Sequence, residues 1–159
     1  MAPDLFWVPL DAPGRLAIAA RPRGNDWLSD EVAGLKRVSV TLVVSLLEPD
    51  EETELGLTDE ATECATAGLQ FLYLPVPDRG VPPNRDEFER VVSEAVREVQ
   101  RGGRVVAHCR QGVGRSALIV LGVLKAFGVP TADAIARVSA ARGRPVSETA
   151  EQAEWIARN

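Results

Sequence analysis

Residues 105–116 read VVAHCRQGVGRS: a short β-branched run, a turn with two glycines, and the start of an apolar segment. The run at 105–107 is typical of a buried strand, and the segment from Ser116 onward is typical of a helix. A turn that leads from a strand into a helix N-terminus can direct successive backbone N–H groups inward, forming a nest for an anion. Gly112 and Gly114 allow the backbone to approach an oxyanion closely. This stretch therefore predicts an anion site between a strand and a helix.

A cysteine and an arginine bracket this turn, with five residues between Cys109 and Arg115. The planar guanidinium of Arg115 can bind two phosphate oxygens at once. The same N–H groups, helix terminus and arginine favour a thiolate, and such surroundings lower a cysteine pKa from about 8.5 to roughly 3.5–7.5. Ser116 can donate a hydrogen bond to the sulfur. The pattern predicts a bound phosphate with a thiolate beneath its phosphorus.

Working outward, strands and helices alternate along the chain. The first expected elements are short strands or an edge hairpin at 5–8 and 16–19, followed by a helix from Ser29 with Val32, Leu35 and Val38 on one face. A strand at 40–47, a helix from Thr58 and a strand at 69–74 come next, and then an irregular proline-rich loop at 75–83. The remaining expected elements are a helix from Asn84 to about residue 101 and helices at 116–127, from Thr131 and at 149–157. This alternation predicts a single α/β domain over residues 1–159 with a mainly parallel central sheet flanked by helices.

Ligands of such sheets bind beyond the carboxyl ends of the strands. The loops after Leu47, Leu74 and His108 are therefore expected on one rim, where the chemistry should be sought.

Composition excludes several classes of protein. The chain has 159 residues, 45% hydrophobic and 26% charged, which is ordinary globular usage. A net charge of −5 with scattered basic residues argues against a nucleic-acid partner. No apolar run reaches the length of a signal-peptide core or a membrane span. Two cysteines cannot form a disulfide scaffold, so we expect a protein of the reducing cytoplasm. We also expect a monomer without a membrane partner.

The stretch HCRQGVGRS at 108–116 resembles the signature loop of the protein tyrosine and dual-specificity phosphatase superfamily. The resemblance implies that Cys109 is the nucleophile, Arg115 the phosphate and transition-state clamp, and Ser116 the hydroxyl that assists breakdown of a phosphocysteine. His108 would orient the loop. The implied phosphate-binding residues are Arg110, Gln111, Gly112, Val113, Gly114 and Arg115. The superfamily uses no metal and no other cofactor, so none is expected here.

Two more segments extend the resemblance, which runs from about Pro22 to Trp155. In LPVPDRGVPP at 74–83, Asp78 resembles the general acid, which must protonate the leaving oxygen. Gln152 resembles a water-positioning glutamine of compact relatives. In SLLEPDE at 45–51, Glu48 or Glu51 is a candidate brace for Arg115.

The sequence thus predicts a phosphoprotein phosphatase acting on phosphotyrosine, with phosphoserine and phosphothreonine as further substrates. Three alternatives stay open: a phospho-binding module without turnover, a phosphatase for a non-protein phosphoester such as a phosphoinositide, and Cys64 as a redox partner of Cys109 rather than a packing residue. Low-molecular-weight phosphatases and arsenate reductases carry a similar loop near the N-terminus, so a cysteine at position 109 argues against both.

Overall fold

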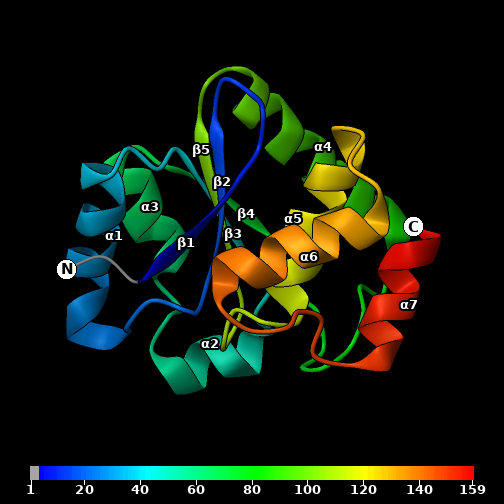
Figure 1. Ribbon diagram of the computed structural model, residues 1–159. Coiled ribbons are helices and arrows are strands. Elements are labelled where there is room, and N and C mark those ends of the chain that lie inside the picture. The colour runs from blue at the N-terminus through cyan, green and yellow to red at the C-terminus, as the bar shows by residue number, and fades with distance from the viewer. Residues whose placement is uncertain (1–3) are drawn as a thin grey trace.

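A five-stranded sheet forms the centre of the protein, seen in a computed structural model that describes residues 4–159 (Figure 1). Its strands are β1 (Leu5–Val8), β2 (Arg15–Ala19), β3 (Leu42–Ser45), β4 (Gln70–Tyr73) and β5 (Arg104–His108). They lie in the order β1-β2-β5-β3-β4. Only β1 runs antiparallel to its neighbour, forming the predicted edge hairpin with β2. The mainly parallel α/β sheet is confirmed.

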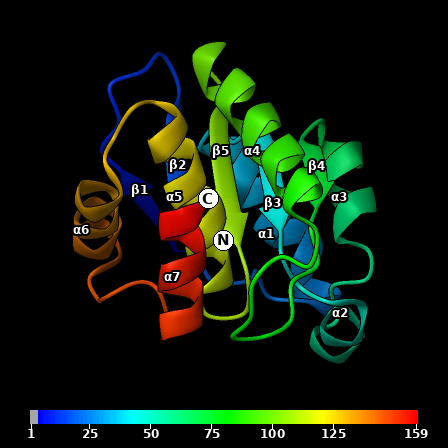
Figure 2. The same cartoon turned by 90° about the vertical axis from the view of Figure 1, so that its right-hand side faces the viewer.

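Helices cover both faces of this sheet (Figures 1 and 2). One face is covered by α1 (Leu28–Arg37) and α3 (Glu60–Ala67), and the other by α4 (Arg85–Gln100), α5 (Arg115–Ala126), α6 (Thr131–Arg142) and α7 (Ala150–Arg158). A one-turn 3₁₀ helix, η1 (Asn25–Trp27), precedes α1, and α2 (Pro49–Leu55) lies beyond the carboxyl ends of the strands. Each face of the sheet is thus shielded from water, as parallel strands require.

Two hydrophobic clusters, one on each face, hold the layers together. Side chains of β5 alternate between them: Val105 and Ala107 pack with α4 and α5, whereas Val106 packs with α1 and α3. Nine of the twelve residues of α5 are buried, because this helix is covered by the sheet and by its neighbouring helices. Residues 109–114, which we call the phosphate loop after the resemblance described above, therefore connect two of the most buried elements of the protein.

The carboxyl ends of the central strands meet at one rim, as expected. Backbone hydrogen bonds continue past the strand ends, from the Leu46 N–H to the His108 carbonyl and from the Leu74 N–H to the Ser45 carbonyl. The Val76 N–H donates in turn to the Leu46 carbonyl. These bonds bring the three loops that follow β3, β4 and β5 side by side.

The segment after Leu47 is a helix, α2, where an irregular loop was predicted. Pro49 occupies its first turn, where the missing N–H costs nothing. Glu48 accepts from the backbone at the third helical position, and the side chain of Glu51 accepts from the Glu48 N–H at 3.0 Å, which completes a capping box. Gly56 ends the helix at φ 70°. The predicted loop is therefore wrong, because the capping contacts at both ends make the segment helical.

Other boundaries differ by a few residues. The helix predicted from Ser29 begins at Leu28, after η1, and ends at Arg37, which leaves Val38 outside it and exposed. The helix predicted from Thr58 begins at Glu60. The strand predicted at 69–74 is β4, at the edge of the sheet. Within residues 4–159, no helix is long and apolar enough to span a membrane.

Candidate active site

The phosphate loop leaves β5 at His108 and enters α5 at Arg115. Gly112 has φ 73°, and a Cβ there would come within 2.5 Å of the Ala19 carbonyl carbon at the end of β2. Both the backbone angle and the close approach require glycine. A Cβ on Gly114 would come within 2.8 Å of the Gln152 side chain. The two glycines therefore let the loop pack tightly between the end of β2 and the first turn of α7.

The thiol of Cys109 lies inside this loop and is 3% exposed. Its sulfur accepts a hydrogen bond from the Gly112 N–H at 3.3 Å and lies 3.3 Å from the Ser116 hydroxyl. Burial by itself raises the pKa of Cys109, but the hydrogen bonds from Ser116 and Gly112 and the charge of Arg115 outweigh it, so this pKa lies below its ordinary value. The sulfur is prepared to act as a thiolate nucleophile.

The guanidinium of Arg115 is buried and held on several sides. Nη1 donates to Glu51 Oε1 at 2.6 Å and to the Val76 carbonyl at 3.0 Å, while Nη2 donates to Glu51 Oε2 at 3.0 Å. Of the two brace candidates, Glu51 makes this contact and Glu48 caps α2 instead. The hydrogen bond from Arg115 is the largest influence on the Glu51 carboxyl and holds its pKa below the ordinary value. Helix α2 thus fixes the plane of the arginine fork.

Asp78 lies on the loop between β4 and α4. Its Oδ1 is 3.3 Å from Nη2 of Arg115, and its side chain is 56% exposed, so it is open to substrate. Together with Cys109 and Arg115 it lines one small pocket. The pocket therefore brings together a thiol of lowered pKa, a guanidinium and an exposed carboxyl.

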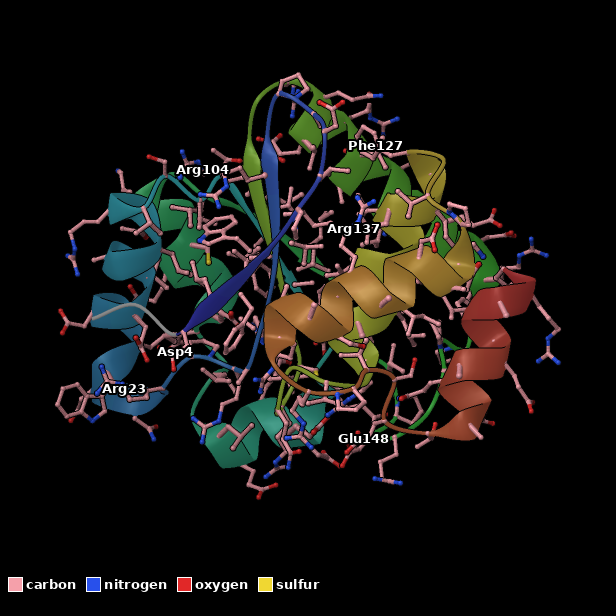
Figure 3. All side chains as sticks on the ribbon, viewed as in Figure 1. Asp4, Arg23, Arg104, Phe127, Arg137 and Glu148 are labelled. Atoms are coloured by element: carbon pink, nitrogen blue, oxygen red, sulfur yellow. The ribbon has the colours of Figure 1, made fainter. Side chains whose placement is uncertain are left out.

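The loop that carries Asp78, which we call the acid loop, contacts the start of α7 and the residues just before it. Arg79 Nη1 forms an ion pair with Glu148 Oε2 at 3.2 Å, and the Arg79 carbonyl accepts from the Thr149 hydroxyl at 3.4 Å. Gln152 donates from Nε2 to the Gly80 carbonyl at 2.9 Å. Glu148 also lines the pocket, at the rim where Figure 3 labels it. These contacts hold Asp78 in position opposite Cys109.

Gln152 is fully buried beside the pocket. Its Oε1 accepts from the backbone N–H groups of Glu148 at 3.1 Å and Thr149 at 3.3 Å, which caps α7. Its structural task is to join the acid loop to that cap, and its role in positioning water stays a prediction.

His108 points to the opposite face of the sheet from the sulfur. Its Nε2 lies 2.6 Å from Glu60 Oε2, and both side chains are buried. Burial lowers the pKa of His108, but the adjacent Glu60 carboxylate and its hydrogen bond raise it above its ordinary value. Nδ1 lies 3.4 Å from the Cys109 carbonyl. This arrangement fits a loop-orienting residue that transfers no proton to substrate.

Cys64 is also buried, on α3 in the cluster between α1 and the sheet, whereas Cys109 belongs to the cluster on the other face. Burial raises the pKa of Cys64 to about 12. This setting is that of a packing residue, which leaves the redox pairing without structural support.

Three residues around the site were missed by sequence reasoning: Glu60, Glu148 and Arg142. Arg142 donates from Nε to the Gly112 carbonyl at 2.9 Å and from Nη2 to the Gln111 carbonyl at 3.1 Å. No local pattern marks these residues, because their partners lie far away along the chain. No group of three or more metal-binding side chains occurs in the described part of the chain.

Comparison with known proteins extends this description. The family model described as polymorphic toxin system, DSP-PTPase phosphatase matches residues 17–128. Among solved structures, kinase associated phosphatase with its catalytic cysteine replaced by serine is 16% identical with a TM-score of 0.88, over 98% of this chain and 93% of that one. Tk-PTP in its active form is 24% identical with a TM-score of 0.77, over 100% and 99%. PTPMT1 is 24% identical with a TM-score of 0.76, over 96% and 92%, and has also been solved with PI(5)P.

Proposed function

Because this chain belongs to the DSP-PTPase phosphatase family of polymorphic toxin systems, we propose that it hydrolyses phosphotyrosine in proteins through a phosphocysteine on Cys109. Phosphoserine and phosphothreonine would be further substrates. One observation carries the proposal: a thiol with a lowered pKa shares a small pocket with a braced arginine and an exposed carboxyl. That combination suits attack on a phosphate monoester and protonation of its leaving group.

In the first step the Cys109 thiolate attacks phosphorus in line with the leaving oxygen. The inward N–H groups of the loop and the Arg115 fork hold the phosphoryl oxygens as charge spreads over them. The bond between phosphorus and the leaving oxygen breaks, and Asp78 gives that oxygen its proton. The product hydroxyl departs and a phosphocysteine remains.

In the second step a water attacks the phosphocysteine and passes a proton to Asp78, now a carboxylate. The sulfur leaves as a thiolate, which accepts hydrogen bonds from the Ser116 hydroxyl and the Gly112 N–H. These bonds stabilise the leaving sulfur, so the same contacts serve both steps. Asp78 ends protonated and ready for the next cycle.

Charge around the pocket supports a protein substrate over a phosphoinositide. Asp78 and Glu148 line the pocket, and the two arginines that line it are already paired with carboxylates of α2, Arg110 with Glu54 at 2.8 Å and Arg115 with Glu51 at 2.6 Å. Such a rim offers little free positive charge to a polyanionic headgroup of the kind that PTPMT1 binds in its PI(5)P complex. It favours phosphopeptides with basic or neutral flanks. We place such phosphoproteins in the cytoplasm and expect a monomer to act on them.

A panel of substrates tests the proposal. Purified protein should hydrolyse p-nitrophenyl phosphate, and vanadate should inhibit it. At low ionic strength, kcat/KM should be higher for a phosphotyrosine peptide with basic flanks than for its acidic counterpart, and the difference should shrink as salt is added. Absent activity would identify a binding module, a vanadate-insensitive activity would contradict hydrolysis at the Cys109 site, and a preference for phosphoinositides over every peptide would identify the non-protein alternative.

A further inference from the structure

We propose that Arg142, at the end of α6, is a positioning residue that holds the phosphate loop in its anion-binding conformation. The inference rests on the proposed function only for its kinetic consequence. Three successive carbonyl groups of the loop accept hydrogen bonds from donors outside it.

The three carbonyls belong to Arg110, Gln111 and Gly112. The Arg110 carbonyl accepts from the Arg21 N–H at 3.4 Å, just beyond β2. The next two, of Gln111 and Gly112, accept from Nη2 and Nε of Arg142. One guanidinium therefore satisfies two consecutive peptide units through two donors of its rigid fork.

A peptide unit is planar and trans, so its C=O and N–H point in opposite directions. The peptide unit between Gln111 and Gly112 contains the Gln111 carbonyl, which Arg142 binds, and the Gly112 N–H, which donates to the sulfur of Cys109 at 3.3 Å. The next unit joins the Gly112 carbonyl to the Val113 N–H. By anchoring both carbonyls on the outside, Arg142 turns both N–H groups toward the anion site.

Gly112 makes this anchor necessary. With φ 73° and no side chain, the residue sits between two peptide units that can rotate easily. A positive charge on the carbonyl side also polarises the hydrogen-bonded peptide and strengthens the donor on its other side. Arg142 thus favours the thiolate of Cys109 from outside the pocket, without touching substrate.

The position of Arg142 is itself fixed. Its guanidinium carbon lies 4.3 Å from the centre of the Phe6 ring, on β1, in cation–π geometry. Helix α6 and strand β1 are packed together along this contact. The edge hairpin, far from the chemistry in the chain, therefore supports the phosphate loop through one arginine.

The test is the pH dependence of Cys109 alkylation by iodoacetate, followed by mass spectrometry, because this readout needs no turnover. Arg142→Met keeps the aliphatic packing on Phe6 and removes the donors. We expect its alkylation profile to move to higher pH, and kcat/KM for p-nitrophenyl phosphate at neutral pH to fall about tenfold or more. Arg142→Lys, with a donor for one carbonyl, should give an alkylation profile and a kcat/KM between those of Arg142→Met and the wild type. The same two measurements on Arg142→Lys test the proposal should Arg142→Met fail to fold.

Arg137→Met is the matched control, since Arg137 lies on the same helix (Figure 3) but donates to the Pro9 carbonyl. It should leave both readouts unchanged. An alkylation profile of Arg142→Met, or of Arg142→Lys in its place, that superimposes on that of the wild type would overturn the proposal. A shifted profile in a protein that hydrolyses no phosphoester would uphold the positioning role while removing the proposed function.

Discussion

Replacing Glu51 with glutamine should lower activity without altering the catalytic loop. Both carboxylate oxygens of Glu51 accept hydrogen bonds from Arg115, Oε1 from Nη1 at 2.6 Å and Oε2 from Nη2 at 3.0 Å. Oε1 also accepts from the Glu48 N–H. A glutamine that keeps those two contacts of Oε1 must place its NH₂ group where Oε2 stood. That group then faces Nη2 of Arg115, donor against donor, and one charge-assisted hydrogen bond is lost.

The size of the effect follows from that exchange. A hydrogen bond to a charged group contributes about 1.5–3 kcal/mol and a neutral one about 0.5–1.5 kcal/mol. The bond that remains still has the charged arginine as its donor, so the loss of the other one amounts to about 1.5–3 kcal/mol of arginine positioning. At about 1.4 kcal/mol per factor of ten, kcat/KM should fall roughly 10- to 150-fold.

Steady-state hydrolysis of p-nitrophenyl phosphate, with thermal unfolding as a check on folding, measures this effect. Asp50→Asn is the matched control, because it removes the same charge from an exposed position of the same helix. It should change kcat/KM by less than about twofold at moderate salt. Equal losses in the two variants would show that α2 acts through its overall charge, and a fully active, folded Glu51→Gln would refute the bracing role.

Four further outcomes are expected. Arg115→Lys should lower kcat at least about tenfold in steady-state assays, since an ammonium group cannot hold two phosphoryl oxygens in one plane, and a wild-type kcat would contradict this. Asp78→Asn should abolish the alkaline limb of the pH–rate profile for a poor leaving group and cost much less with a good one; persistence of that limb would place the acid elsewhere. Cys109→Ser should retain phosphate binding in calorimetry but show no turnover. Because the pKa of His108 is raised in the folded protein, its protonation stabilises the fold fully below the ordinary histidine pKa of about 6.5, and this contribution is lost as pH rises through the folded value. Urea unfolding should therefore show a free energy of unfolding that declines above neutral pH, and His108→Asn should flatten the decline.

The parts of the site that are local in sequence could be predicted. The strand, the glycine turn and the helix around Cys109 lie within one short stretch, and the periodicity of each flank is clear. The parallel arrangement of the strands followed from their alternation with helices, and it placed the Asp78 loop beside the phosphate loop.

Of the contacts that support the site, only the Glu51 brace of Arg115 was among the candidates, and the sequence did not separate it from Glu48. The others could not be predicted because they join distant segments: His108 and Glu60 are 48 residues apart, and Arg142 lies 31 residues from Gln111. A glutamate that is buried against a histidine or an arginine looks the same in sequence as a solvated one. Only the packing of α2, α3 and α6 around the loop shows which of the many charged side chains form ion pairs or hydrogen bonds with residues of the site.

Detection of the covalent intermediate tests the central claim most directly. Protein mixed with p-nitrophenyl phosphate and quenched in acid within the first turnovers should carry one phosphoryl group, and peptide mapping should place it on Cys109. The adduct should be absent from Cys109→Ser and should disappear as substrate is exhausted. Sustained turnover with no phosphate on Cys109, or turnover that survives in Cys109→Ser, would contradict the mechanism.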